Sequence, residues 1–224
     1  MSGGFPVDLI LFAMVAAFLV LRLRSVLGRR QGFERPPQER PIPGQGMPGP
    51  AESDAPQMPP PPVAGAPRLA IPDARSPVGQ ALQRIRQADA GFDPAAFLAG
   101  AEGAFRMIVA AFAKGDRETL RNLLSADTYA GFEQALVTRE TAGERQRTEI
   151  RAVHDMAIEA ADLRGSVADI TVRIISDQVN VTTGPNGDIV SGAEAVTELT
   201  DIWTFQRDLS NADPTWKLVG THAA

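Results

Sequence analysis

Two side chains of the sequence have the chemistry of a general base. His154 and Asp201 each lie among apolar residues in a segment of alternating polarity, which predicts that both face inward from β-strands. A buried carboxylate beside an imidazole can move protons in a cavity enzyme. The alternative is that His154 is a hydrogen-bonded core residue and that Asp201 lies in a bulge or on the surface. Nothing in the sequence brings the two strands together at these residues, so we assign no catalytic residue.

The sequence lacks the other common motifs of catalysis and ligand binding. It contains no cysteine, which excludes disulfides, thiolate metal sites and cysteine catalysis. The second histidine, His222, has no ligand spacing to His154. The turn signal at 184–187 is predicted to lie between strands, where no helix N-terminus is present to bind phosphate. We therefore expect no metal and no cofactor, and a binding protein rather than an enzyme.

Large apolar side chains form a second candidate site. If the predicted sheet curves away from the longest predicted helix, these side chains enclose a cavity suited to an acyl chain or an apolar peptide segment. The alternative is that they form the core and enclose no cavity. The candidates are Phe97, Phe105, Phe112, Met156, Trp203, Phe205 and Trp216.

Helical patterns occupy the first half of residues 76–224. Ser76 and Asp93 each precede a proline, and a capping side chain followed by proline is a typical helix start. The second of these helices carries apolar residues at three- and four-residue spacing, which predicts one broad apolar face. Four helices are expected, over 77–90 and 94–114 and after caps at Asp116 and Asp127.

Alternating patterns follow after Arg147. The first strand is expected to point one set of residues inward, namely Ile150, Ala152, His154, Met156, Ile158 and Ala160. A second strand follows Gly165, and a bulge or bend is expected near Ser176 and Asp177. There its inward set changes parity, from Ala168, Ile170, Val172 and Ile174 to Val179 and Val181. Two more strands contain Trp203 and Trp216. Helices followed by a meander of strands predict an α+β domain, with helices packed on one face of a bent antiparallel sheet.

The charge distribution separates the chain into dissimilar parts. Residues 77–224 carry fourteen basic and twenty-one acidic side chains, a net charge of −7, whereas residues 1–35 carry five arginines and two acids, a net charge of +3. An acidic domain argues against nucleic acid as a partner, because phosphate binding needs a basic surface. Arg84 and Arg86 lie on the first predicted helix, and we expect them to contact anionic lipid, with packing of the helix within the domain as the alternative.

Residues 1–30 have the pattern of a retained membrane anchor. Positive charges follow the apolar run instead of preceding it, the reverse of a cleavable signal peptide. Residues 5–23 would span about 28 Å as a helix, close to the thickness of a hydrocarbon core. The positive-inside bias then places the short N-terminus outside and residues 22–224 inside. The anchor comprises Leu9, Ile10, Leu11, Phe12, Val15, Phe18, Leu19, Val20 and Leu21, and the arginines expected to contact anionic lipid are Arg22, Arg24, Arg29 and Arg30.

A proline-rich segment, residues 31–75, separates the anchor from the domain at 76–224. Most of the eighteen prolines of the chain lie here, among Gly, Gln and Ala. Such a composition cannot bury enough apolar surface to offset its ordering entropy, which predicts a disordered linker. At about 3.1 Å per residue in the polyproline conformation, about forty residues reach at most about 120 Å. We interpret the segment as a tether, with docking of proline-recognising modules as the alternative.

Three stretches of the sequence resemble a known family: DLILFAMVAAFLVLRLRSVLGRR, FDPAAFLAGAEGAFRMIVAAFAKGDRETLRNLLS and TWKLVGTH. With the proline-rich linker, they resemble the bacterial TimA group, relatives of the Tim forty-four-like scaffold subunit of the mitochondrial inner-membrane protein-import translocase. The resemblance implies a cystatin-like, or nuclear-transport-factor-two-like, domain that encloses an apolar cavity. It also implies affinity for cardiolipin-rich bilayers and an adaptor role beside translocation or membrane-protein assembly machinery.

The resemblance does not extend to the long N-terminal region of the mitochondrial scaffold, which contacts the translocase and its chaperone. A spanning helix and a linker stand in its place, so chaperone tethering is not carried over to particular residues. We expect a membrane-anchored adaptor, single-pass in the inner membrane with the domain in the cytoplasm, whose partners are lipid and translocase, chaperone or envelope-assembly proteins. The alternative is a cavity enzyme or a small-molecule or lipid carrier of the same fold.

Overall fold

The structure is a computed structural model that describes residues 66–223. The predicted anchor and most of the predicted linker lie outside these residues. The described elements are, in chain order, β1 (Arg68–Ala70), α2 (Pro77–Ala88), α3 (Pro94–Lys114), α4 (Arg117–Leu123), α5 (Ala126–Thr141), β2 (Arg145–Arg164), β3 (Val167–Thr183), β4 (Ile189–Asp208) and β5 (Lys217–Ala223).

Local side-chain caps set the helix starts. The hydroxyl of Ser76 accepts a hydrogen bond from the amide of Gly79 at 2.9 Å, and Asp93 accepts one from Ala96 at 2.8 Å. Each cap satisfies one of the amides that a helix start leaves without a partner. Helix α3 ends at Gly115, whose φ of 74° is the left-handed conformation that glycine adopts readily. The predicted bounds of α2 and α3 are thus confirmed to within two residues.

One predicted cap is wrong. We expected Asp127 to cap the fourth helix, but α5 begins two residues earlier, where the Ser125 hydroxyl accepts a hydrogen bond from the amide of Thr128. Asp127 instead lies in the first turn, where its negative charge interacts favourably with the helix dipole. An isolated β-bridge joins Leu124, just before α5, to Leu218 of β5. This tertiary contact helps to fix the residue at which α5 begins.

The five strands form one sheet in the order β1-β2-β3-β4-β5. Strand β1 pairs with β2 in parallel, and the other neighbours are antiparallel. Strand β1 lies inside the segment 31–75 that we predicted to be a linker, and the sequence analysis missed it. Its three residues are exposed and carry no alternation, so its position depends on pairing with residues 155–157 of β2.

Strand β2 departs from strict alternation because it contains β-bulges. Its register against β3 shifts between Ile150 and Ala152, between Val153 and Asp155, and between Ile158 and Ala160. Each shift adds a residue to β2 and changes which parity faces inward. The buried residues are therefore Val153, Met156, Ala157 and Ile158, whereas His154 and Ala160 are exposed.

Strand β3 keeps one inward parity for longer than predicted. Its buried set continues from Ala168 through Ser176 and Gln178, so the change of parity lies just beyond Ser176 and Asp177. The register shift with β4 lies further along, between Gln178 and Asn180. Val179 and Val181, of the opposite parity, are buried after it.

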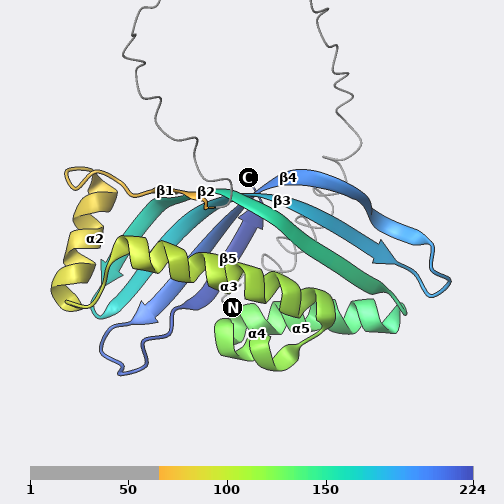
Figure 1. Cartoon of the computed structure of the whole chain (residues 1–224). Coiled ribbons are helices and arrows are strands. Elements are labelled where there is room, and N and C mark those ends of the chain that lie inside the picture. The colour runs from red at the N-terminus through yellow and green to blue at the C-terminus, as the bar shows by residue number, and fades with distance from the viewer. Residues whose placement is uncertain (1–65, 224) are drawn as a thin grey trace, which may run out of the picture.

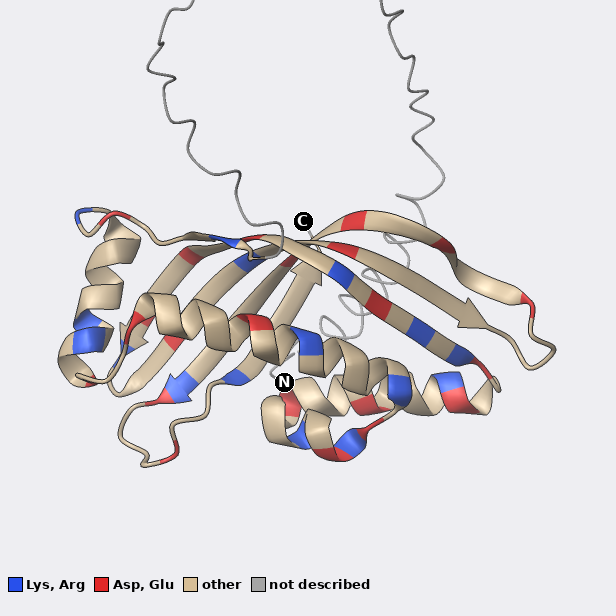
Figure 2. Cartoon of the chain, viewed as in Figure 1, with Lys and Arg blue, Asp and Glu red and all other residues tan. Residues whose placement is uncertain are grey.

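The helices pack on one face of the curved sheet, and the predicted α+β arrangement, cystatin-like or nuclear-transport-factor-two-like, is confirmed (Figure 1). Figure 1 shows α3 running across this face, with α2 near one end of α3 and α4 and α5 near the other. The core between them includes Leu98, Phe105 and Ile108 of α3, all at most 1% exposed. Acidic and basic residues are interspersed over helices and strands instead of gathering on one face (Figure 2).

Candidate functional site

An open apolar cavity of about 350 Å³ lies along the flank of α3, and we call it the α3 groove. One side consists of α3 residues at helical spacing. The rest comes from the loop before α3, the end of α4, β4 and the two residues before β5. Small residues of α3 leave the space open, because an ideal Cβ on Gly100 would meet no atom within 4 Å. The lining residues are Asp89, Gly91, Phe92, Asp93, Ala96, Phe97, Gly100, Ala101, Ala104, Met107, Leu123, Phe205, Arg207, Thr215 and Trp216.

Four aromatic rings form one wall of the groove. Phe97 and Trp216 are in edge-to-face contact, with ring centroids 4.9 Å apart, and Phe97 also meets Phe205 edge to face at 6.0 Å. Phe92 packs against Trp216 at 5.9 Å. Edge-to-face pairs align the positive ring edge with the negative ring face and hold the rings in fixed orientations. The wall is therefore rigid, since Phe97 and Phe205 are also anchored in the core.

One end of the groove is polar and nearly neutral in charge. Nη1 of Arg207 lies 2.9 Å from Oδ2 of Asp89, and the two side chains are 16% and 23% exposed. The Nε–H of Arg207 is buried and has no acceptor among the described residues. A buried donor without a partner is costly, because it has lost its hydrogen bond to water. This end of the groove is thus polar, with the Nε–H of Arg207 enclosed by protein.

The structure places only three of the predicted cavity residues at this groove: Phe97, Phe205 and Trp216. Phe105 and Trp203 contact each other at 4.9 Å beneath α3, and Met156 is fully buried. Phe112 packs on Phe132 at 5.1 Å. The sequence analysis did not name Phe92, Leu123, Met107 or Arg207. Ala, Gly and Met residues recur along α3 at helical spacing, and this recurrence was a sequence signal for one face of the groove. The aromatic residues opposite that face come about one hundred positions later in the chain, so helical spacing could not reveal them.

The predicted pairing of His154 with Asp201 is wrong. Asp201 faces inward and is 6% exposed, and its Oδ2 accepts a hydrogen bond from Nε2 of Gln178 at 3.2 Å. His154 is at the bulge of β2 and points to the opposite face of the sheet, where its Nε2 lies 2.8 Å from Oδ2 of Asp177. The bulge reversed the parity on which the prediction depended. The two groups are therefore separated by the sheet and cannot share a proton.

Helix α2 packs within the domain. Ala81, Leu82 and Ile85 are buried, and α2 contacts β2. Its apolar face is thus covered by protein, and the interpretation that this face rests on a membrane is wrong. Arg84 and Arg86 remain exposed on the other side, with Arg84 within 3.8 Å of Asp162. Contact of these arginines with anionic lipid stays a prediction.

Among residues 66–223, α3 is the one helix long and apolar enough to cross a membrane. Its apolar side faces β2 and carries Phe97, Leu98, Phe105 and Ile108, all of them buried. The length and composition of α3 are therefore explained by its place in the core. The segment that we predicted to span the membrane lies outside the described residues.

Residues 78–223 match the Tim44-like domain family. The chain belongs to this family. The match covers α2 to β5, all of the described elements except β1. The family resemblance inferred from the sequence is thus confirmed for the domain. The Tim44-like match does not include the predicted anchor or linker, and no curated protein matches the chain.

Several solved structures are similar to this Tim44-like domain at low identity. The intermembrane space region of the chloroplast protein ARC6 is 12% identical, with a TM-score of 0.41, and the match covers 56% of this chain and 95% of that chain. A protein from Streptomyces avermitilis, described as a dehydratase of the NTF2-like family, is 15% identical with a TM-score of 0.37 over 58% and 96% of the two chains. A protein from Shewanella frigidimarina, described as a ketosteroid isomerase, is 13% identical with a TM-score of 0.28 over 55% and 92%. Similarities of this size carry no functional argument.

Proposed function

We propose that the protein is a membrane-anchored adaptor whose Tim44-like domain binds an apolar segment of a partner protein in the α3 groove. Residues 1–30 hold the chain in the inner membrane, and the linker suspends the domain at the cytoplasmic surface. The partner belongs to translocation or membrane-protein assembly machinery. Family membership supports the adaptor role, and the groove supports a binding function.

The observation that carries the proposal is the groove's combination of an open apolar volume with a rigid aromatic wall. A volume of about 350 Å³ is within the range of ligand sites, which are mostly apolar with a few placed polar groups. Trp216 is half-buried and Met107 is 50% exposed, so apolar surface remains for a partner to cover. Covering such surface is the main favourable term in protein association.

The polar end of the groove favours a peptide over an anionic lipid. Asp89 balances the charge of Arg207, and Asp93 also lines the groove, so this end has no net positive charge to attract a phosphate or carboxylate. An apolar peptide segment carries no anionic headgroup and can cover the aromatic wall of the groove.

The predicted tether is compatible with this role. A linker with a reach of at most about 120 Å lets the domain meet segments near the membrane surface without fixing its orientation. Tethering also raises the effective concentration of the domain for partners in the same membrane. Each arginine next to the anchor adds about 1 kcal/mol of attraction to anionic headgroups.

The test places a photoreactive residue, p-benzoylphenylalanine, at position 107 of the full chain in living cells. Position 107 lines the groove and is exposed, so a bound segment lies within reach of the probe. We expect mass spectrometry to identify a crosslinked peptide of another protein with apolar residues at the crosslink. Crosslinking to lipid or to a small molecule instead would overturn the proposed occupant.

Two glycines of α3 provide the occupancy test and its control. A Cβ on Gly100 or on Gly103 would meet no atom within 4 Å, but only Gly100 lines the groove. Gly100→Leu fills the groove, and both substitutions raise helix propensity, so the fold is retained. We expect Gly100→Leu to reduce crosslinking at least about tenfold, the effect of about 1.4 kcal/mol, and Gly103→Leu to leave it unchanged. Equal crosslinking in both variants would contradict binding in the groove.

A further inference from the structure

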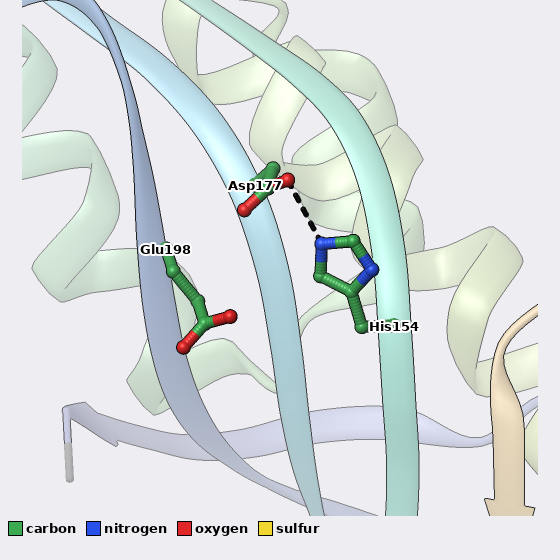
Figure 3. A group of neighbouring side chains, drawn as sticks. All are labelled: His154, Asp177 and Glu198. Carbon is green, nitrogen blue, oxygen red and sulfur yellow. Dashed lines mark ion pairs between the residues drawn. The ribbon is translucent and has the colours of Figure 1, made fainter. Parts of the chain in front are cut away.

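Three side chains from three neighbouring strands converge on the face of the sheet that points away from α3 (Figure 3). They are His154 of β2, Asp177 of β3 and Glu198 of β4. Nε2 of His154 lies 2.8 Å from Oδ2 of Asp177, and one potential ligand atom from each residue lies within 4.8 Å of the other two. The group is on the opposite face of the sheet from Asp201 and does not line the α3 groove.

The backbone produces this arrangement through a β-bulge in β2 and a pair of directly opposed residues on β3 and β4. The register shift between Val153 and Asp155 leaves His154 as the extra residue of β2, and a bulge of this kind re-aims a side chain. Asp177 and Glu198 are directly opposite each other on β3 and β4. Neither relationship is visible in the sequence spacing, which is why the sequence analysis found no set of metal ligands.

Within residues 66–223, Asp177 and Glu198 have no Lys or Arg partner of the kind that neighbouring carboxylates have. Arg173 binds Asp155 and Glu159, with distances of 3.0 and 2.9 Å, and Arg147 binds Glu149 and Glu194.

In contrast, no Lys or Arg in residues 66–223 is within ion-pair distance of Asp177 or Glu198. Like charges directly opposite on neighbouring strands destabilise a sheet. A cation bound between the two carboxylates would remove this repulsion.

We propose that His154, Asp177 and Glu198 form a binding site for a divalent transition-metal ion, best matched by Zn²⁺. Imidazole nitrogen and carboxylate oxygen are standard Zn²⁺ ligands, at about 2.0–2.2 Å from the metal. Tetrahedral ligands at those lengths are about 3.4 Å apart, so small side-chain rotations from the present separations complete the site. Mg²⁺ and Ca²⁺ prefer all-oxygen sites, which the imidazole disfavours.

The bound ion has two structural consequences. It connects β2, β3 and β4 across the face of the sheet that the helices leave uncovered, and so stabilises the folded domain by ligand linkage. Three protein ligands leave a fourth tetrahedral position, which faces solvent because His154 and Glu198 are exposed. That position can bind water or a side chain of a partner protein.

The experiment is isothermal titration of ZnCl₂ into the full-length chain, purified in detergent after removal of metals with a chelator, with a thermal melt in the absence and presence of Zn²⁺. We expect one ion per chain and a higher melting temperature with Zn²⁺. We expect His154→Ala, Asp177→Asn and Glu198→Gln each to weaken Zn²⁺ binding about tenfold or more and to lose the temperature rise. Because these side chains are partly exposed, the metal-free variants should melt close to the metal-free wild type.

Matched controls remove the same chemical groups elsewhere. His222→Ala deletes the second histidine, and Glu194→Gln deletes a β4 carboxylate that binds Arg147. Both should keep the wild-type affinity. The proposal is overturned if Zn²⁺ does not bind at 100-fold excess over the chain, or if Glu198→Gln binds as the wild type does. In either case the group is a His154–Asp177 ion pair and not a three-ligand site.

Discussion

The rings of Phe97 and Trp216 meet edge to face, with centroids 4.9 Å apart and an interplanar angle of 67°. Phe97 is on α3 and is 8% exposed, whereas Trp216 precedes β5 and is half-buried. The contact joins the hydrophobic core to the wall of the α3 groove. A partner that packs against Trp216 therefore touches a side chain fixed by the core, and little ordering entropy is lost on binding.

Replacing Phe97 with alanine should destabilise the domain. The ring is buried against Phe92, Phe205 and Trp216, so its removal leaves a cavity and costs about 3–5 kcal/mol of the free energy of unfolding. Urea denaturation followed by tryptophan fluorescence measures the change. Met107→Ala, at the exposed edge of the same groove, should change stability by less than about 0.5 kcal/mol. Equal effects of both substitutions would contradict the assignment of Phe97 to the core.

Gly192→Ala should destabilise the β3–β4 pairing more than Gly187→Ala does. Both glycines have positive φ, 79° and 88°, which costs about 1–2 kcal/mol for alanine. At Gly192 a Cβ would also lie 2.0 Å from the carbonyl oxygen of Asn180, whereas at Gly187 it would meet no atom within 4 Å. Chemical denaturation of the two variants should give a larger loss for Gly192→Ala. A smaller loss than that of Gly187→Ala would contradict the register of this hairpin.

The domain should lose stability in acid partly through Arg117. Its guanidinium hydrogen bonds to Glu140 and Glu133 join α4 to α5, and the bond from Arg117 lowers the pKa of Glu140 below 4.5. The folded state thus binds fewer protons than the unfolded chain near this pH. The stabilisation is present above pH 4.5 and is lost as the pH falls through the lowered pKa.

Arg117→Gln should therefore flatten the loss of stability as the pH falls below 4.5, as measured by urea denaturation at a series of pH values. Arg145→Gln makes the same charge change at the start of β2, outside this network, and should keep the wild-type pH dependence. If Arg117→Gln keeps the full pH dependence, the carboxylates that respond to acid are elsewhere.

Removing residues 1–30 should release the protein from the membrane. The apolar run with its arginine flank is the predicted anchor, and the described domain has its apolar helix faces packed against the sheet. Cell fractionation with alkaline extraction should find the full chain in the membrane and the shortened chain in the soluble fraction. A reporter fused after Ala224 should be active only in the cytoplasm, and activity only outside would reverse the predicted topology.

Pattern reasoning was sufficient for the helices because their signals are local. Asp93, a proline and a three- and four-residue apolar period together predicted α3 at its observed bounds. The same reasoning missed β1, whose residues Arg68–Ala70 have no period of their own and become a strand by pairing with β2. It also placed the start of α5 at Asp127 instead of at Ser125, since either residue type can cap a helix.

The sheet shows where local patterns stop being informative. Alternation correctly placed Ile174, Trp203 and Phe205 inside, because β3 and β4 pair without a register shift over these residues. It failed at His154, since a bulge inserts a residue without a sequence signal strong enough to reveal it. The pair His154 and Asp201 was therefore wrong, and the convergence of His154 with Asp177 and Glu198 was not predicted.

The order of elements, the α+β class and the family resemblance follow from the amino-acid sequence, because caps, periods and composition act over a few residues at a time. The α3 groove depends on residues more than one hundred positions apart, such as Phe97 with Trp216. The group of His154, Asp177 and Glu198 likewise joins three different strands. Their meeting is set by strand register and by helix packing on the sheet. These are properties of the whole domain, since a shift of one residue in a strand moves its side chains to the other face.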